Sequence, residues 1–136
     1  MTEQEGRDMI KRHEGVRFLP YRDHLGILTI GIGHNLSEGL TPQMVKFIFD
    51  EDVKIAKTEL CRVFPADILN CLPSAKYWVL VDMMFQLGAS KFRSFRKMIR
   101  AINKLDYKTA AKEMLNSRWA RQSPLRAREL ASIMEE

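Results

Sequence analysis

The run AKYWVLVDMMFQLG, residues 75–88, limits the possible folds more than any other segment of the chain. Its apolar side chains would lie on nearly every side of a helix, so this helix is stable in water only when other helices surround it. Gly88 is the usual kind of residue to end such a helix. The run therefore predicts a helical lobe, residues 64–136, built around a buried central helix.

Further helices are expected on both sides of this run. Three should follow it, near residues 91–104, 107–118 and 124–134, the last beginning with a Ser123-Pro124 cap. Upstream, Thr41-Pro42 is the same kind of start, and no Gly or Pro interrupts the chain from Gln43 to Val63. We expect this long helix, within residues 41–63, to connect two lobes.

The first forty residues predict a small lobe with a β-hairpin. Thr2 and Glu5 fit a capping box and Gly15 fits a helix stop, so residues 3–13 should be helical with Glu14 at the C-terminal end. RFLPYRD and ILTIGIG then flank the turn His24-Leu25-Gly26, which predicts two short antiparallel strands. The chain is therefore expected to be a single α+β domain, with a small lobe at 1–40, the connecting helix at 41–63 and the helical lobe at 64–136.

Composition narrows the possible partners. The net charge of +5 favours polyanions such as nucleic acid, anionic membrane surfaces and bacterial cell wall. Arg118, Arg121, Arg126 and Arg128 form a basic cluster without a recognised nucleic-acid module, so we interpret them as a solvated face attracted to cell wall. No nucleic-acid partner is expected.

The cysteines, histidines and terminal segment indicate what the chain lacks. Cys61 and Cys71 fit neither a redox motif nor a zinc site, and both are expected to be buried thiols, with a disulfide less favoured. The histidines lack a second ligand at metal-binding spacing, so no metal or cofactor is expected. Without the apolar core of a signal peptide or an apolar run of about 18 residues, we expect a protein made in the cytosol and not inserted in a membrane. A monomer is also expected.

Three polar residues of the small lobe form a candidate catalytic set. If residues 24–26 are the turn, Asp23 faces Ile27 and Thr29 lies diagonally on the same face of the hairpin, roughly 7–8 Å away. A carboxylate and a hydroxyl on one face can orient a water molecule and accept its proton. Glu14 differs because the negative end of a helix dipole disfavours a second negative charge, which suits a general acid.

Two carboxyl groups in dissimilar environments are what the cleavage of a glycosidic bond requires. For an arbitrary pair of acidic residues, solvated surface charges are the favoured interpretation, so the residue types alone do not support a catalytic role for Glu14 and Asp23.

Longer motifs support the catalytic interpretation. EG, YRD and GILTIGIGH stand in this order at close spacing, and they resemble the N-terminal motif of the lysozymes of T-even bacteriophages, glycoside hydrolase family 24. MMFQLG at 83–88 resembles the central helix of that family, and NSRWARQSPLRAR at 116–128 resembles its closing motif. Together these segments span most of the chain, so the resemblance implies a lysozyme-like fold.

The resemblance also implies an activity. It implies a muramidase that hydrolyses the β-1,4 bond between N-acetylmuramic acid and N-acetylglucosamine in peptidoglycan, with Glu14 as the acid and Asp23 and Thr29 activating water. An inverted product configuration is expected from the family. The resemblance further implies an endolysin for host cell lysis by a bacteriophage, held in the host cytoplasm until a holin opens the membrane and then acting at the periplasm and cell wall.

Other positions carry roles through the resemblance only. It implies substrate contacts at Asn35 and Phe85, a salt bridge between His34 and Asp52, and a cation at Arg126 beside the catalytic glutamate. Gln86 and Trp119 are implied as a supporting pair. For Phe85 and Trp119, a place in the hydrophobic core is the stronger interpretation, because both stand in apolar helical runs.

The sequence departs from the family in two places. Only NLSEGL separates His34 from Thr41, where the T-even proteins have a much longer stretch, so the small lobe is trimmed and the contact at Asn35 is in doubt. Glu113 replaces an amide that contacts substrate in the family. The alternatives are a lytic transglycosylase, against which Asp23 and Thr29 argue, and a non-catalytic basic module that binds cell wall.

Overall fold

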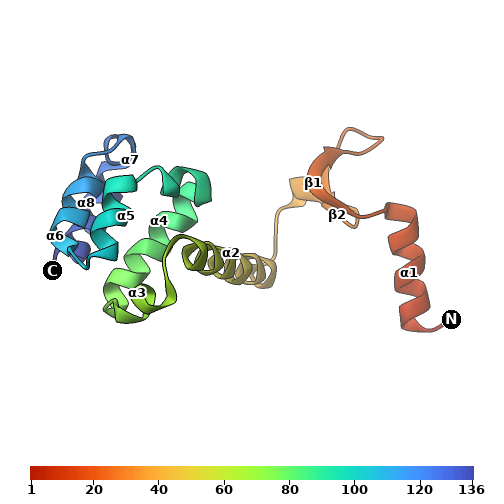
Figure 1. The fold of residues 1–136 in the computed structure, drawn as a ribbon. Coiled ribbons are helices and arrows are strands. Elements are labelled where there is room, and N and C mark those ends of the chain that lie inside the picture. Colours follow the sequence, from red (N-terminus) through yellow and green to blue (C-terminus); the bar gives the residue numbers. More distant parts are fainter. The chain divides into compact units, whose positions relative to one another are not determined.

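The computed structural model describes residues 1–136, which separate into two compact units, Met1–Phe47 and Ile48–Glu136. The elements follow the chain in the order α1, β1, β2, β3, a 3-10 turn η1, and then α2 to α8 (Figure 1). The small antiparallel sheet and the predominance of helices confirm the predicted α+β, lysozyme-like class.

Helix α1, Glu3–Glu14, begins with the predicted capping box. Thr2 Oγ1 accepts a hydrogen bond of 3.1 Å from the Glu5 amide, and Glu5 Oε2 accepts one of 2.7 Å from the Thr2 amide. Gly15 ends the helix at φ 75°, a conformation that costs a residue with a Cβ. Glu14 is therefore the last residue of α1, as predicted.

The sheet has three strands in the order β1, β2, β3, each antiparallel to its neighbour. Strands β1, Arg17–Arg22, and β2, Leu28–Gly31, form the predicted hairpin, and Gly26 has φ 79° in its turn. Strand β3, His34–Asn35, and η1, Leu36–Glu38, were not predicted. A strand of two residues is too short to show an alternating pattern.

Helix α2, Pro42–Val63, matches the predicted long helix. Thr41 caps it, because Thr41 Oγ1 accepts a hydrogen bond of 3.2 Å from the Met44 amide. Ala56 and Leu60 are its buried residues, so the C-terminal half of α2 packs into the core of the second unit.

The core of the second unit surrounds α4, Ser74–Arg93. Leu80 and Met83 on this helix are fully buried, which confirms the central helix predicted from residues 75–88. Gly88 leaves the helical conformation at φ 79° and ψ 167°, so the first part of α4 ends there as predicted. Figure 1 shows four further helices gathered beside α4: α5 (Arg96–Asn103), α6 (Tyr107–Leu115), α7 (Arg118–Gln122) and α8 (Pro124–Glu135).

Two helix ranges were predicted incorrectly, and one helix was missed. The helix expected at 91–104 is interrupted at Ser94, and α5 spans only Arg96–Asn103. The helix expected at 107–118 ends earlier, because α6 is Tyr107–Leu115 and Ser117 caps the separate α7, Arg118–Gln122. Helix α3, Ala66–Cys71, was not predicted at all. Serine side chains that bond to nearby backbone groups can start or stop a helix with little change in the apolar pattern.

Helix α8, Pro124–Glu135, has the predicted proline start, but its capping residue behaves differently. Ser123 makes no side-chain cap hydrogen bond, and its Oγ instead accepts one of 3.2 Å from Gln86 Nε2. The other end of α8 is fixed by Lys76, which is only 6% exposed. Lys76 Nζ donates to the carbonyl oxygens of Ile133 and Met134 at 3.1 Å and 2.7 Å.

Cys61 and Cys71 are both free and exposed, so the prediction that they are buried is wrong. Both lie at helix C-terminal ends, where the faces toward the core are occupied by larger side chains such as Leu60 and Leu72. Burial raises the pKa of Tyr77, and the charge of the Cys61 thiolate raises it further. None of the helices has the length and apolar character required to span a membrane.

Candidate active site

Glu14 lies against the turn between β2 and β3. A Cβ atom built on Gly33 would stand 2.5 Å from Glu14 Oε2 and 2.6 Å from its Cδ. Gly33 has φ 69°, a backbone conformation that favours glycine. The side chain of Glu14 thus occupies the place that any side chain at residue 33 would need.

Asp23 forms the hairpin turn as well as being a candidate base. Its Oδ1 accepts hydrogen bonds of 2.9 Å from the amides of Leu25 and Ile27. The Asp23 amide donates to the Ile27 carbonyl at 3.0 Å, which confirms that these two residues face each other. Both side-chain hydrogen bonds are accepted by one oxygen, so the carboxylate is fixed in orientation.

Thr29 lies on the central strand and is 4% exposed. Because Thr29 pairs with Tyr21, it is diagonal to Asp23 on the same face of the hairpin, as predicted. Its hydroxyl donates a 2.8 Å hydrogen bond to the Ile27 carbonyl. With the proton used in this way, Oγ1 presents lone pairs and can accept a hydrogen bond from a water molecule.

His34 and Asn35 form β3 beside β2, where they pair with Ile30 and Thr29. The Nε2 atom of His34 lies 3.2 Å from the Gly39 carbonyl oxygen. Asn35 Oδ1 accepts a 2.9 Å hydrogen bond from the Ser37 amide and caps η1. Asn35 therefore has a structural role, and its NH₂ group is the end that remains to contact a ligand.

The remaining predicted residues belong to the second unit. Asp52 was expected to pair with His34, and Arg126 to lie near Glu14. His34 and Glu14 belong to the first unit, so both pairings stay predictions. Within its own unit, Arg126 forms a salt bridge with Asp82, with Nη2 2.7 Å and Nε 2.8 Å from Oδ1.

Phe85 is not part of the hydrophobic core. Its side chain is 41% exposed, and its ring centroid lies 5.8 Å from that of Phe49. Phe85 and Asp52 border the same hollow of about 320 Å³ between α2 and α4. An exposed aromatic ring beside polar groups can stack on a sugar, so the structure keeps Phe85 as a candidate ligand contact.

Trp119 is a core residue, in agreement with the interpretation favoured by its apolar surroundings. It is 5% exposed, and its ring packs edge-on against Phe95 with centroids 6.1 Å apart. Its Nε1 donates to Gln86 Oε1 at 2.8 Å, and Gln86 in turn bonds to Ser123. This chain of hydrogen bonds connects α4, α7 and the start of α8.

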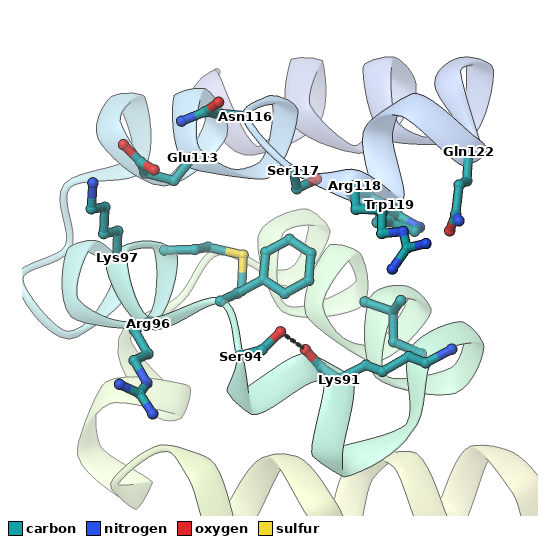
Figure 2. Close-up of a pocket in the computed structure, with 13 residues that line it drawn as sticks. Lys91, Ser94, Arg96, Lys97, Glu113, Asn116, Ser117, Arg118, Trp119 and Gln122 are labelled. Carbon is teal, nitrogen blue, oxygen red and sulfur yellow. Dashed lines mark hydrogen bonds between the residues drawn. The ribbon is translucent and has the colours of Figure 1, made fainter.

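A pocket of about 800 Å³ opens beside Trp119 in the second unit (Figure 2). Lys91, Arg96, Lys97 and Arg118 line it, together with Glu113 as its one acidic residue. Figure 2 shows Lys97 and Glu113 at the same end of the pocket, with Arg118 and Gln122 at the other. The excess of cations over an apolar floor suits a ligand that carries carboxylates on a sugar or peptide frame.

Two residues of the site were missed in the sequence. Gly33 stands in the repeated pattern IGIGH, and its spacing from Gly31 could have indicated a turn that approaches another group closely. Asp82 is the only acid in the apolar run 75–88, which could have indicated a partner. The structure contains no group of three or more His, Cys, Asp or Glu residues placed to bind a metal ion.

Comparison with known proteins connects this geometry to a family. The family model described as phage lysozyme matches residues 11–133. Probable T4-type lysozyme 2 of Dictyostelium discoideum is 30% identical over 157 residues, which cover 95% of this chain and 92% of that protein. An endolysin of Acyrthosiphon pisum secondary endosymbiont phage 1 is 24% identical, covering 87% of this chain and 79% of the endolysin.

A third relative is much longer than this chain. The peptidoglycan hydrolase gp36 of Pseudomonas phage phiKMV is 30% identical over 128 residues, which cover 89% of this chain and only 14% of that protein. The family match includes the segments around Glu14, Asp23, Thr29 and Trp119. On the extent of these matches, the chain belongs to the phage lysozyme family and is a glycosidase.

Proposed function

We propose that this enzyme is a peptidoglycan muramidase that hydrolyses the β-1,4 bond between N-acetylmuramic acid and N-acetylglucosamine. The observation that carries the proposal is the placement of Glu14 at the end of α1 against Gly33, in the same unit as the Asp23 and Thr29 face of the hairpin. Relatives named peptidoglycan hydrolase and endolysin support this substrate.

In the proposed mechanism, Glu14 donates its proton to the glycosidic oxygen as the bond to the anomeric carbon breaks. Asp23 and Thr29 hold a water molecule on the opposite face of the sugar ring. Thr29 Oγ1 accepts one hydrogen bond from this water, and the Asp23 carboxylate accepts its proton as the oxygen attacks. Attack from that face inverts the configuration, so the new reducing end forms first as the α-anomer.

Residues of the second unit are proposed to hold the glycan strand and its peptides. Phe85 offers an exposed ring for a sugar, and the cations that line the 800 Å³ pocket attract peptide carboxylates. In the first unit, the NH₂ group of Asn35 is the proposed contact.

The proposal is tested by comparing wild-type protein with Glu14→Gln in a peptidoglycan degradation assay. The substitution keeps the shape of the side chain and removes its acidic proton, so turnover should fall by about 10²-fold or more. Glu38→Gln is the matched control, since Glu38 is an exposed glutamate of the same unit. Full activity in Glu14→Gln would refute the assignment.

The products distinguish hydrolysis from the alternative of a lytic transglycosylase. Hydrolysis adds one water to each cut, whereas transglycosylation forms an internal anhydro bond and adds none. Mass spectrometry of the released fragments should therefore show reducing ends roughly 18 Da heavier than anhydro ends. This difference is the mass of one water, the species that the Asp23 and Thr29 face is proposed to activate. Anhydro products would show that these residues do not activate water.

The proposed biological use is lysis of a host bacterium by a phage. The names of the endolysin relatives support this use. The enzyme would then pass through a holin pore from the host cytoplasm to the periplasm and cell wall. Accumulation of intact cells when the holin is absent, followed by lysis after the membrane is permeabilised, is the expected behaviour.

A further inference from the structure

A second cation-lined groove lies between α6 and α8. It has a volume of about 570 Å³, and its residues are different from those of the pocket beside Trp119. Lys108 and Lys112 stand one turn apart on α6, and Arg128 lines the groove from α8. Ala111 and Ala131 are buried where the two helices pack. Small residues at this contact bring the helices close together and leave the long cationic side chains at its edges.

The three cations are not neutralised by neighbouring residues. All are exposed, and none takes part in a salt bridge, although many other ionic side chains of the chain are equally exposed. Glu135 is the single acid that lines the groove. The surrounding segment is also strongly basic, since residues 91–128 contain twelve Lys and Arg but only two Asp and Glu. The electrostatic potential at the groove is therefore strongly positive.

We propose that this groove is a second, non-catalytic binding site for the carboxylates of cell-wall peptides, and that it keeps the enzyme on the wall between cuts. The inference rests on the proposed function, because it takes peptidoglycan as the substrate. Lys108 and Lys112 are spaced to contact neighbouring carboxylates, and the planar guanidinium of Arg128 can bind one of them through two hydrogen bonds. The hydroxyl of Ser132, which also lines the groove, adds a further donor.

The lining of the groove favours peptide carboxylates over other polyanions. Leu115 is the only large exposed apolar residue there, whereas binding in a bilayer surface needs a broad apolar face beside the cations. No aromatic side chain lines the groove, so single-stranded nucleic acid would find no platform for its bases. Peptide carboxylates each carry one charge and recur along the cell-wall polymer, so their arrangement matches that of the cations spaced along α6.

The experiment measures binding to purified sacculi by co-sedimentation, in a Glu14→Gln background that leaves the wall intact. The test variant is Lys108→Glu, Lys112→Glu and Arg128→Glu. Loss of three exposed ionic contacts should weaken apparent binding by about tenfold at low salt, and by less at high salt where the charges are screened.

The matched control changes the net charge by the same amount, but at other positions of the basic segment. Arg93→Glu, Arg100→Glu and Lys104→Glu alter exposed cations that line neither the groove nor the pocket. We expect less than about a twofold loss for this variant, because a general field effect is weaker than a direct contact. Equal losses in both variants, or no loss in the test variant, would overturn the proposal. Glutamine substitutions at the same three groove positions, with circular dichroism, separate lost binding from lost folding.

The chemistry of the ligand is tested on modified sacculi. Amidation of the peptide carboxylates should weaken binding of the parent protein by a larger factor than binding of the test variant, in which the pocket beside Trp119 is the remaining proposed carboxylate site. If binding survives amidation but is lost after removal of phosphate polymers, or if duplex DNA or anionic vesicles bind more tightly through the same residues, the carboxylate assignment is wrong. Activity retained by Glu14→Gln would instead count against the proposed function and leave the binding result standing.

Discussion

A methyl group at Gly33 would test whether the close approach of the turn positions Glu14. In Gly33→Ala the new Cβ would lie 2.5 Å from Oε2 and 2.6 Å from Cδ of Glu14. Ordinary contacts between such atoms are about 3.5 Å or longer. The carboxyl group must therefore retreat by about 1 Å, or the turn between β2 and β3 must shift by a similar amount.

The stability cost and the catalytic cost of this change have different origins. Alanine at φ 69° costs about 1–2 kcal/mol, because its Cβ crowds the following carbonyl. Relieving the contact itself costs little, since the carboxyl group is the free end of a flexible side chain. The same flexibility lets the Glu14 carboxyl group move away from its proposed catalytic position. A displacement of about 1 Å in a reacting group can lower the rate by roughly 10²-fold.

Gly31→Ala is a matched control for this experiment. Gly31 has φ 70°, nearly the same as Gly33, but a Cβ built there meets no atom within 4 Å. Both variants should therefore lose similar stability, which thermal unfolding followed by circular dichroism measures. The initial rate of peptidoglycan solubilisation, taken well below both melting temperatures, should fall by about 10-fold to 10²-fold only in Gly33→Ala. Equal rates in the two variants would refute the positioning of Glu14 by Gly33.

Two further substitutions probe residues with more than one contact. Lys76→Met should lower the free energy of unfolding by about 2–4 kcal/mol in urea titrations, because it leaves the carbonyls of Ile133 and Met134 without their charged donor; a loss no larger than that of the exposed Lys104→Met would contradict this. Asp23→Asn keeps Oδ1 as an acceptor for the turn and removes the charge, so turnover should fall by about 10²-fold with little change in stability. Asp23→Ala should lose both turnover and stability. Full turnover in Asp23→Asn would show that Asp23 stabilises the turn and has no part in catalysis.

Features encoded by neighbouring residues were predictable from the sequence. The capping box of Thr2 and Glu5, the stop at Gly15 and the turn at Gly26 each depend on residues within five positions of one another. The diagonal relation of Asp23 and Thr29 followed for the same reason, since the length of the turn sets the register of the hairpin. The relative positions of side chains on such a hairpin can therefore be predicted from the sequence.

Features set by contacts between distant elements were not predictable. Ser123 has the sequence of a cap, but Gln86 on another helix bonds to its hydroxyl. The break after Leu115 depends on Ser117, whose side chain caps α7 and bonds to the Met114 carbonyl. Apolar periodicity continues through such a break, because the residues on both sides still face one core. Burial of Cys61 was mispredicted for a related reason, since residue type does not say which face of a helix is covered.

The three residues of the proposed chemistry are each held by a backbone feature of the first unit. Glu14 is held by the end of α1 and the space left at Gly33, Asp23 by the amides of its own turn, and Thr29 by the Ile27 carbonyl. None of these restraints involves the second unit, which carries the cation-lined pocket and groove. Substitutions in the second unit that spare folding should therefore act mainly on substrate binding, and those around the hairpin mainly on turnover. This division follows because positioning a reacting atom requires rigid local contacts, whereas attracting a polyanionic wall requires only charge spread over a surface.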